Sequence, residues 1–205
     1  MCQMFKYKII LAGQENVGKS SLIARFCDNV FNEEMQSTIG VSFKRKKIQV
    51  EKNIVIDVNI WDFGGEERYR LLFPAYLNGA SAALVLYDTT NRESFDDIQN
   101  WIQLIDENTD NIVKVIIGAK SDLVEKKEVS FEEARALSSE LKCGGIPIET
   151  SSKTGENVEQ AFMNVAQEIL KKLMQKCKVC GELFNRKLKI CNYCGSNVEL
   201  NVILS

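Results

Sequence analysis

A glycine-rich segment near the N-terminus, Gly13–Ser20, reads Gly-Gln-Glu-Asn-Val-Gly-Lys-Ser and fills every fixed position of Gly-x-x-x-x-Gly-Lys-Ser. It follows the mostly apolar run 7–12 and precedes a helical pattern, so it joins a strand to a helix. Glycines let the loop turn its N–H groups toward phosphate, and the helix N-terminus adds partial positive charge. Lys19 can reach the β- and γ-phosphates, and the Ser20 hydroxyl can bind Mg²⁺. The segment therefore predicts a nucleoside triphosphate site.

A second group of motifs indicates which base is bound. The β-branched run 115–118 is followed by Ala-Lys-Ser-Asp, and Asp122 can accept hydrogen bonds from the N1–H and amino group of guanine. Adenine lacks this donor pair, so a buried carboxylate rejects it. Segment 149–153, Glu-Thr-Ser-Ser-Lys, can bring backbone N–H groups to the guanine carbonyl oxygen. Asp62 and Gly65 form an Asp-x-x-Gly at a strand end, suited to Mg²⁺ and the γ-phosphate. Together these motifs predict guanine nucleotides.

In this order and spacing, the motifs resemble those of the small GTPases, and within them the Rab branch. Segment 38–43, Thr-Ile-Gly-Val-Ser-Phe, is similar to the Rab switch I, in which Thr38 reads the γ-phosphate and Mg²⁺. Segment 61–70 resembles switch II, and 86–90 resembles the strand end beyond it. The resemblance covers roughly residues 5–174.

The resemblance assigns roles to individual residues. Lys19, Thr38 and Glu66 would be the catalytic residues, and the Mg²⁺ ligands would be Ser20, Thr38 and Asp62. Phe31 would stack on the guanine. The residues expected to bind GTP or GDP are Gly13, Glu15, Asn16, Val17, Gly18, Lys19, Ser20, Ser21, Phe31, Thr38, Gly65, Lys120, Asp122, Leu123, Ser151, Ser152 and Lys153.

Three aromatic residues, Phe43, Trp61 and Tyr76, match the triad with which Rab proteins contact effectors. The resemblance implies protein effectors and regulators that bind through the switch regions. The other interpretation of these residues is ordinary strand core.

Three positions depart from the family pattern. Glu66 stands where most of the superfamily has a glutamine that orients the attacking water, and it adds negative charge beside an anionic transition state. Glu15 places a second acid near the γ-phosphate, where it can obstruct an arginine finger. Ala119 replaces an asparagine whose amide contacts guanine N7, which should cost on the order of 1–3 kcal/mol of affinity. We expect hydrolysis to be slow without a partner.

Strand and helix patterns alternate along the first 175 residues, which predicts an α/β fold of three layers. A mostly parallel six-stranded sheet with one antiparallel edge strand is expected, with the functional loops at the carboxyl ends of the strands. The expected strands are 5–12, 42–50, 54–61, 82–88, 112–118 and 146–149, and the expected helices are 18–27, 68–78, 92–108, 131–142 and 156–175. We divide the chain into a small GTPase domain, 1–175, and a small domain with its tail, 176–205.

The small domain contains two Cys-x-x-Cys-Gly segments, which resemble the knuckles of a zinc ribbon. Their cysteines are Cys177, Cys180, Cys191 and Cys194. Four thiolates suit tetrahedral Zn²⁺, an iron site of rubredoxin type uses the same ligands, and two disulfides are the third possibility. The stretch 183–190 is expected to form a hairpin with Phe184, Leu188 and Ile190 on one face.

Charge and termini limit the partners that the sequence supports. Residues 176–205 carry five basic and two acidic side chains, which leaves −5 for the preceding residues. Zinc thiolates offset part of that positive charge, which disfavours nucleic acid as the ribbon's partner; we expect protein docking, with an anionic membrane surface or a structural cap as alternatives. The last four residues contain no cysteine, so no lipid anchor is expected. Without a secretory signal, we expect a cytoplasmic protein that reaches membranes only peripherally, through partners.

Two functions remain open from the sequence. The first is a GTP-hydrolysing molecular switch, and the second is a catalytically weak nucleotide-binding scaffold that acts through its ribbon.

Overall fold

A six-stranded sheet forms the centre of the protein, in the order β2-β3-β1-β4-β5-β6. The structure, a computed structural model, describes residues 2–33, 38, 40–64 and 70–197. The strands of this sheet are β1 (Gln3–Ala12), β2 (Val41–Glu51), β3 (Ile54–Phe63), β4 (Ala82–Asp88), β5 (Val113–Ala119) and β6 (Ile148–Thr150). Each lies within two residues of the bounds expected from the sequence.

The direction of each strand follows from its connection. β2 and β3 are joined by a short turn and pair antiparallel, whereas β1 pairs parallel with both β3 and β4, as do β4 with β5 and β5 with β6. Helical crossovers separate the parallel strands, which is the connection that parallel pairing requires. The predicted sheet with one antiparallel edge strand is therefore confirmed.

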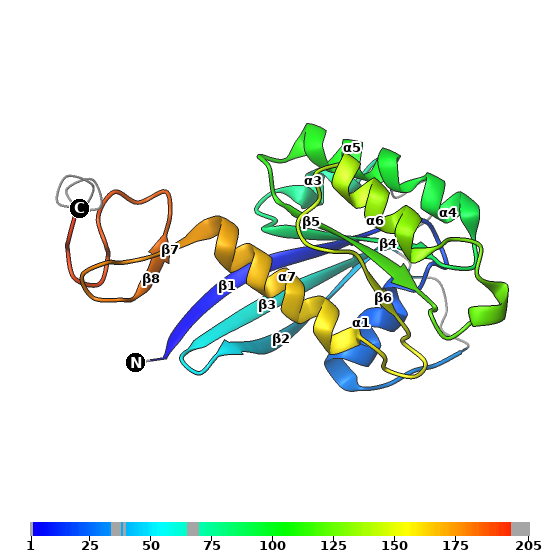
Figure 1. Cartoon of the computed structure of the whole chain (residues 1–205), viewed down its shortest axis with the longest axis horizontal. Helices are drawn as coiled ribbons and strands as arrows, with labels where there is room; N and C mark the ends of the chain where they lie inside the picture. The colour runs from blue at the N-terminus through cyan, green and yellow to red at the C-terminus, as the bar shows by residue number, and fades with distance from the viewer. Residues whose placement is uncertain (1, 34–37, 39, 65–69, 198–205) are drawn as a thin grey trace.

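Helices cover both faces of this sheet, as Figure 1 shows. They are α1 (Lys19–Asp28), α3 (Phe73–Leu77), α4 (Arg92–Asp96), α5 (Ile98–Asn108), η1 (Val124–Lys126), α6 (Phe131–Glu140) and α7 (Val158–Leu173). Alternate strand residues point to opposite faces: Ile9 belongs to the cluster beneath α1 and α7, and Ile10 to the cluster beneath α3, α5 and α6. The result is the predicted three-layer architecture.

Two expected helices differ from the structure. The segment 92–108 is interrupted at Asp97, which ends α4 and precedes α5. The Asp97 carboxylate accepts hydrogen bonds from Arg70 and Asn100, which hold the interruption in place. Within the expected helix 68–78, the structure describes residues from 70 onward, and α3 begins only at Phe73. Pro74 suits the first turn, where its missing N–H costs nothing.

The four cysteines lie in a small two-stranded unit that follows α7. Its strands are β7 (Met174–Lys176) and β8 (Leu183–Asn185), which pair antiparallel, and Ile190 bridges to Asn197. The expected hairpin over 183–190 is wrong in extent, because Asn185 accepts a turn hydrogen bond from the Leu188 N–H just beyond β8. Phe184 is buried while Leu188 and Ile190 are exposed, so the three do not share one covered face.

This cysteine unit contacts the rest of the protein at two points. The side-chain amide of Gln3, which is 7% exposed, donates to the Leu183 carbonyl at 2.9 Å and accepts from the Leu183 N–H at 3.1 Å. Arg186 donates to carbonyl groups at the end of α7, those of Lys171 and Met174. The unit therefore lies beside the start of β1 (Figure 1). The glycine-rich loop follows the other end of β1, so the two are separated by roughly 30 Å.

Candidate functional site

The glycine-rich loop surrounds the side chain of Lys19, the first residue of α1. Its ammonium group donates to the carbonyl oxygens of Gly13 at 2.8 Å and Gln14 at 2.6 Å, and only 6% of Lys19 is exposed. A Cβ atom at Gly13 would lie 2.4 Å from the Leu86 carbonyl oxygen, so the loop can pass β4 only as glycine. The loop thus presents a buried cation at its centre.

Burial lowers the pKa of Lys19 to about 8, and the nearby carboxylates of Asp62 and Glu15 oppose this shift. The cation has lost most of its hydration, so an anion in the loop would replace what water no longer supplies. A phosphate group, which carries several charged oxygens, fits this requirement.

Three side-chain oxygens meet beside Lys19. Ser20 Oγ donates to Asp62 Oδ2 at 2.5 Å and lies 2.6 Å from Thr38 Oγ1, which donates to the same carboxylate oxygen at 3.2 Å. The other oxygen, Asp62 Oδ1, is buried and has no hydrogen-bond partner among the described residues. Burial raises the pKa of Asp62, against the hydrogen bonds from Ser20 and Thr38 and the charge of Lys19. Two hydroxyls and an unpartnered carboxylate oxygen are ligands that suit Mg²⁺.

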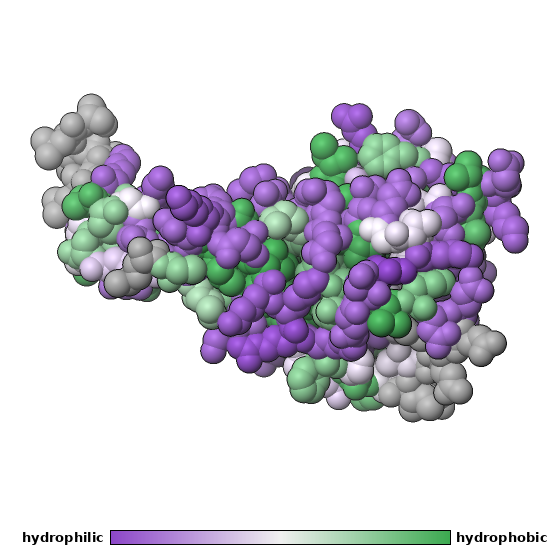
Figure 2. Space-filling view, turned by 90° about the horizontal axis from the view of Figure 1, so that it is seen from below, coloured by the Kyte–Doolittle hydropathy of each residue, from purple (hydrophilic) through white to green (hydrophobic). Residues whose placement is uncertain are grey.

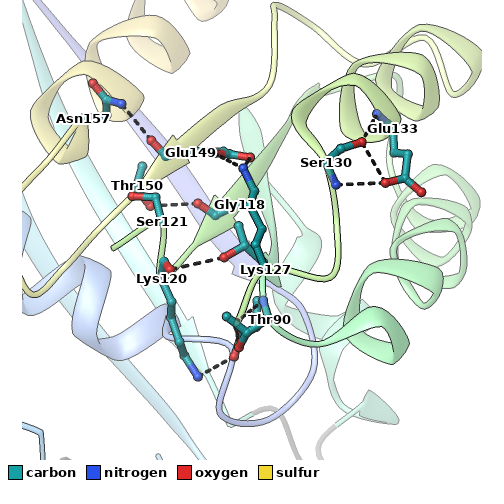
Figure 3. A network of polar contacts seen from close by, with 12 residues as sticks. Thr90, Gly118, Lys120, Ser121, Lys127, Ser130, Glu133, Glu149, Thr150 and Asn157 are labelled. Carbon is teal, nitrogen blue, oxygen red and sulfur yellow. Dashed lines mark hydrogen bonds and ion pairs between the residues drawn. The ribbon is translucent and has the colours of Figure 1, made fainter. Parts of the chain in front are cut away.

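The expected base-binding residues lie at the carboxyl ends of β5 and β6. The hydroxyl of Ser151, a fully buried residue, donates to Asp122 Oδ1 at 2.6 Å and fixes the orientation of that carboxylate. Ser121 N–H donates to the Thr150 carbonyl, which joins the loops that follow β5 and β6 (Figure 3). Lys120 pairs with Asp88, at the end of β4, at 2.6 Å. The Asp122 carboxylate is therefore held in place by Ser151, and it can accept hydrogen bonds from two donors of a base.

One cavity of about 400 Å³ joins these groups. The expected nucleotide-binding residues that line it are Glu15, Asn16, Gly18, Lys19, Ser20, Ser21, Phe31, Thr38, Lys120, Asp122, Leu123, Ser152 and Lys153. Three more, Gly13, Val17 and Ser151, lie behind this lining in the same loops. Gly65 and Glu66 lie outside the described residues. A single cavity thus joins the loop that is expected to bind phosphate to the loops that are expected to bind the base.

Sequence reasoning missed several residues of this site. Asn32, Glu33 and Phe63 also line the cavity; no motif marks Asn32 or Glu33, and Phe63 stands at a variable position of the Asp-x-x-Gly motif. Arg25 on α1 donates through Nε to the Ser152 carbonyl at 2.6 Å and through Nη2 to the Lys153 carbonyl at 2.7 Å. It therefore fastens the base-binding loop to the helix that follows the phosphate loop. The sequence signal for Arg25 was weak, because an exposed-face arginine on a helix is ordinary.

Comparison with known proteins agrees with this geometry. A family model described as "Ras family" matches residues 8–171. The chain is 43% identical to "Ras-related protein RABD1" of Arabidopsis thaliana over 82% of both chains. It is 42% identical to "Ras-related protein Rab-1A" of Dictyostelium discoideum over 82% of this chain and 83% of that one.

The chain belongs to the Ras family. It is a Rab-like small GTPase, for which GTP, GDP and Mg²⁺ are the expected ligands. The cavity fits that ligand set, because Lys19 faces its phosphate end and Asp122 its base end. No helix among the described residues is both long and apolar enough to cross a membrane.

Two departures from the Ras-family pattern can be placed in the structure. Ala119 is 3% exposed, and a Cβ atom added at Gly18 would lie 3.7 Å from its methyl group. The methyl thus faces the phosphate loop without offering it a hydrogen bond. The Arg25 contacts join a different pair of segments, α1 and the loop at Ser152 and Lys153. Glu15 lines the phosphate end of the cavity, and its charge acts on Lys19.

The three aromatic residues of this Ras-family member form one continuous cluster. Ring centroids are 5.8 Å apart for Phe43 and Trp61, and 6.0 Å apart for Trp61 and Tyr76. Phe43 is 69% exposed, and the Lys8 ammonium lies 4.4 Å from the Trp61 ring centroid. Phe43 is thus not strand core, whereas Trp61 and Tyr76 also pack against the cluster beneath α3.

The four cysteines beyond the Ras-family domain converge on one point. Their sulfur atoms all lie within 4.8 Å of one another, with Cys177 and Cys191 buried and Cys180 and Cys194 exposed. The Ser196 hydroxyl lies 3.3 Å from Cys177 Sγ and 3.1 Å from Cys194 Sγ. Hydrogen bonds from the Cys180 N–H and from Ser196 lower the pKa of Cys177. Against a hydrogen bond from the Glu182 backbone, burial and the neighbouring cysteines raise the pKa of Cys180, so the thiolate is favoured at Cys177 over Cys180.

Proposed function

We propose that this Rab-like protein is a molecular switch that binds GTP with Mg²⁺ and hydrolyses it slowly unless a partner assists. The observation that carries the proposal is the arrangement around one cavity: Lys19 and the Ser20–Thr38–Asp62 cluster at one end, and Asp122 at the other.

Each group has a defined part in this proposal. Lys19 would neutralise the β- and γ-phosphates. Ser20, Thr38 and Asp62 would hold Mg²⁺, and Asp62 would offer Oδ1, the carboxylate oxygen that has no hydrogen-bond partner among the described residues. Bound Mg²⁺ would offset negative charge on the phosphates. Asp122, held by Ser151, accepts the two donors of guanine, and Phe31 covers the base.

Switching follows from contacts made only with the γ-phosphate. Thr38 and the Gly65 N–H would bind the γ-phosphate in the GTP state, which would order both switch segments. Hydrolysis would remove these contacts and release the segments. Phe43, Trp61 and Tyr76 lie beside these segments and would contact effectors there.

Slow hydrolysis is expected from charge. Glu66 lacks the amide donor of glutamine and adds negative charge beside a transition state that is already anionic. Glu15, on the cavity wall near Lys19, adds more and stands where an arginine finger would enter.

Glu66 gives the test of this proposal. If its charge opposes the transition state, single-turnover hydrolysis should be faster in Glu66→Gln than in wild type, by about tenfold. If Glu66 instead acts as a base toward the attacking water, Glu66→Ala should be slower than wild type, and the wild-type rate should fall as the pH drops through the pKa of the carboxylate. The matched control is GDP affinity, which neither substitution should change. Equal rates for all three proteins would mean that position 66 carries no chemistry.

For the C-terminal unit we propose a structural Zn²⁺ site in a domain that extends from residue 176, and a role in docking a protein partner. Convergence of four sulfur atoms within 4.8 Å supports tetrahedral coordination. Elemental analysis of the purified protein should find about one zinc per chain, and iron in its place would assign a rubredoxin-type centre. Absence of both metals would overturn the metal site. We further propose that the protein acts in the cytoplasm and that it reaches membranes through partner proteins.

The second candidate function is a catalytically weak GTP/GDP-binding scaffold that acts through its ribbon. Ala119 and Glu15 favour it, because both depart from the pattern of an efficient switch. A hydrolysis rate that no cell extract can stimulate would favour the scaffold, whereas stimulation by extract would favour the switch.

A further inference from the structure

The C-terminal ribbon exposes most of its large apolar side chains. Within 176–197, Phe184 is buried and Leu183 is half-buried against the GTPase core. The remaining four are exposed: Val179 by 64%, Leu188 by 45%, Ile190 by 53% and Tyr193 by 46%. A unit this small gains stability from every apolar side chain that it buries. Four large apolar side chains left exposed to solvent therefore indicate a binding surface.

Three of these exposed residues are chain neighbours of cluster cysteines. Val179 precedes Cys180, Ile190 precedes Cys191, and Tyr193 precedes Cys194. Because the cysteine sulfur atoms lie within 4.8 Å of one another, the three neighbours are held around the same point. Leu188 lies in the turn after β8, where its carbonyl oxygen accepts from the Gln175 side chain at 3.4 Å. We call Val179, Ile190 and Tyr193, together with Leu188, the apolar collar. Figure 2 shows apolar atoms at the outer end of the ribbon, away from the sheet.

Positive charge accompanies the apolar collar. Lys178, Lys187 and Lys189 are exposed and adjoin collar residues in the chain. Arg186 contacts the end of α7. Residues 176–197 carry five basic side chains and one acidic one, and four thiolates on Zn²⁺ would contribute −2. The ribbon thus remains positive beside a GTPase domain whose net charge is −5.

We propose that the apolar collar and its lysines bind an acidic peptide segment of a partner protein that carries at least one large apolar residue. This inference rests on the metal-bound ribbon proposed above. An acidic segment is attracted to the ribbon and repelled by the GTPase domain, which directs it to the collar. Tyr193 provides the kind of aromatic anchor that dominates such interfaces.

The charge distribution favours a peptide over a membrane. A short acidic peptide can contact the ribbon alone, whereas an extended anionic membrane would also face the GTPase domain, whose net charge is −5. Gln3 and Arg186 fix the ribbon roughly 30 Å from the phosphate loop, so the docking surface keeps one shape whichever nucleotide is bound.

The test uses full-length, GDP-loaded protein whose zinc content has been measured. Short random peptides displayed on phage are selected on it, and enriched sequences are synthesised for calorimetry. We expect enrichment of acidic residues around a large apolar one. Val179→Ser/Tyr193→Ser should weaken binding about tenfold, and Lys178→Glu/Lys187→Glu should weaken it and reduce its salt dependence. Ile146→Ser, which removes an equally exposed apolar residue from the GTPase domain, should have no effect.

Three results would overturn the inference. One is enrichment of peptides without acidic residues, or no enrichment above that seen on Val179→Ser/Tyr193→Ser. Another is collar-dependent binding to phosphatidylserine vesicles in the absence of peptide binding, which would assign a membrane surface. The third is collar-dependent dimerisation by light scattering, which would assign a second copy. Because zinc and GDP are measured in every preparation, failure of the metal site is distinguished from failure of the docking surface.

Discussion

Arg25 links the two halves of the nucleotide site. Its guanidinium donates to two carbonyl oxygens of the base-binding loop, at Ser152 and Lys153, while its backbone belongs to the helix that begins at Lys19. Ala119 offers the phosphate loop no hydrogen bond, so we expect the Arg25 contacts to contribute to holding the two halves together. Loosening the base-binding loop is expected to speed nucleotide release.

We therefore predict that Arg25→Ala accelerates GDP release roughly tenfold, since losing charged hydrogen bonds at a half-exposed site should cost about 1–2 kcal/mol. Stopped-flow release of a fluorescent GDP analogue measures this rate. Arg25→Lys keeps the charge without the planar fork and should be intermediate. A lower melting temperature with an unchanged release rate would assign Arg25 a purely structural role.

Sequence motifs identified the site residues that stand at fixed motif positions. They missed the site residues that only tertiary contacts bring to the cavity. Lys19, Ser20 and Asp122 stand at fixed motif positions, so spacing alone located them. Arg25 reaches a loop more than a hundred residues later in the chain, and Phe63 enters the cavity from the end of β3. Only the three-dimensional packing of α1 and β3 around the cavity reveals such contacts.

Local capping decides where α6 begins. The Ser130 hydroxyl accepts from the Glu133 N–H, and the Glu133 carboxylate accepts from the Ser130 N–H at 2.9 Å, a reciprocal capping box (Figure 3). The Ser130 N–H and hydroxyl, with Arg92, hold the pKa of Glu133 at about 2. The folded pKa lies below the ordinary value of 4.5, so the ionised carboxylate stabilises the fold above pH 4.5 and loses this effect as the pH falls toward 2.

Ser130→Ala should destabilise the protein by about 1 kcal/mol, because one helix N–H loses its acceptor. For Glu133→Gln we predict a deficit in the urea midpoint that is constant above about pH 4.5 and shrinks as the pH falls below it. Comparison with wild type at each pH cancels the separate acid sensitivity of the cysteine cluster. A deficit that grew on acidification would contradict the assignment.

Capping and turn signals also explain which elements the sequence predicted well. α6 begins at its capping box, one residue after Ser130, as expected. The interruption of 92–108 at Asp97 depends on Arg70, which is distant in sequence, so periodicity predicted one helix instead of two. In the ribbon, alternation placed Phe184, Leu188 and Ile190 on one face, but the turn after β8 separated them.

On the scale of the whole molecule, the ribbon is a fixed extension of the GTPase domain. Met174 belongs to the core beneath α7, Gln3 pairs with both backbone groups of Leu183, and Arg186 covers the end of α7. The nucleotide site depends on none of these contacts, since it lies at the opposite ends of the strands. Nucleotide binding by the GTPase domain and the proposed metal binding and docking by the ribbon can therefore be measured separately.

Removal of the metal with a chelator should unfold the ribbon and lower the melting temperature, because the metal no longer holds the cysteines that flank β8. The GTPase domain should stay folded, because β1 and α7 belong to its own core. GDP affinity should stay unchanged. Circular dichroism and calorimetry on the same sample measure both effects. Gln3→Ala should lower the melting temperature without changing metal content, and loss of GDP binding on chelation would show that the two parts are one cooperative unit.

The central claim is that this cavity selects guanine nucleotides through Asp122. Calorimetric titration of the nucleotide-free protein with GDP, XDP and ADP tests it directly. Wild type should bind GDP at least about a hundredfold more tightly than ADP, and Asp122→Asn should weaken GDP and favour XDP, because its amide offers one donor and one acceptor. Comparable affinities for GDP and ADP in the wild type, or unchanged selectivity in Asp122→Asn, would contradict the account.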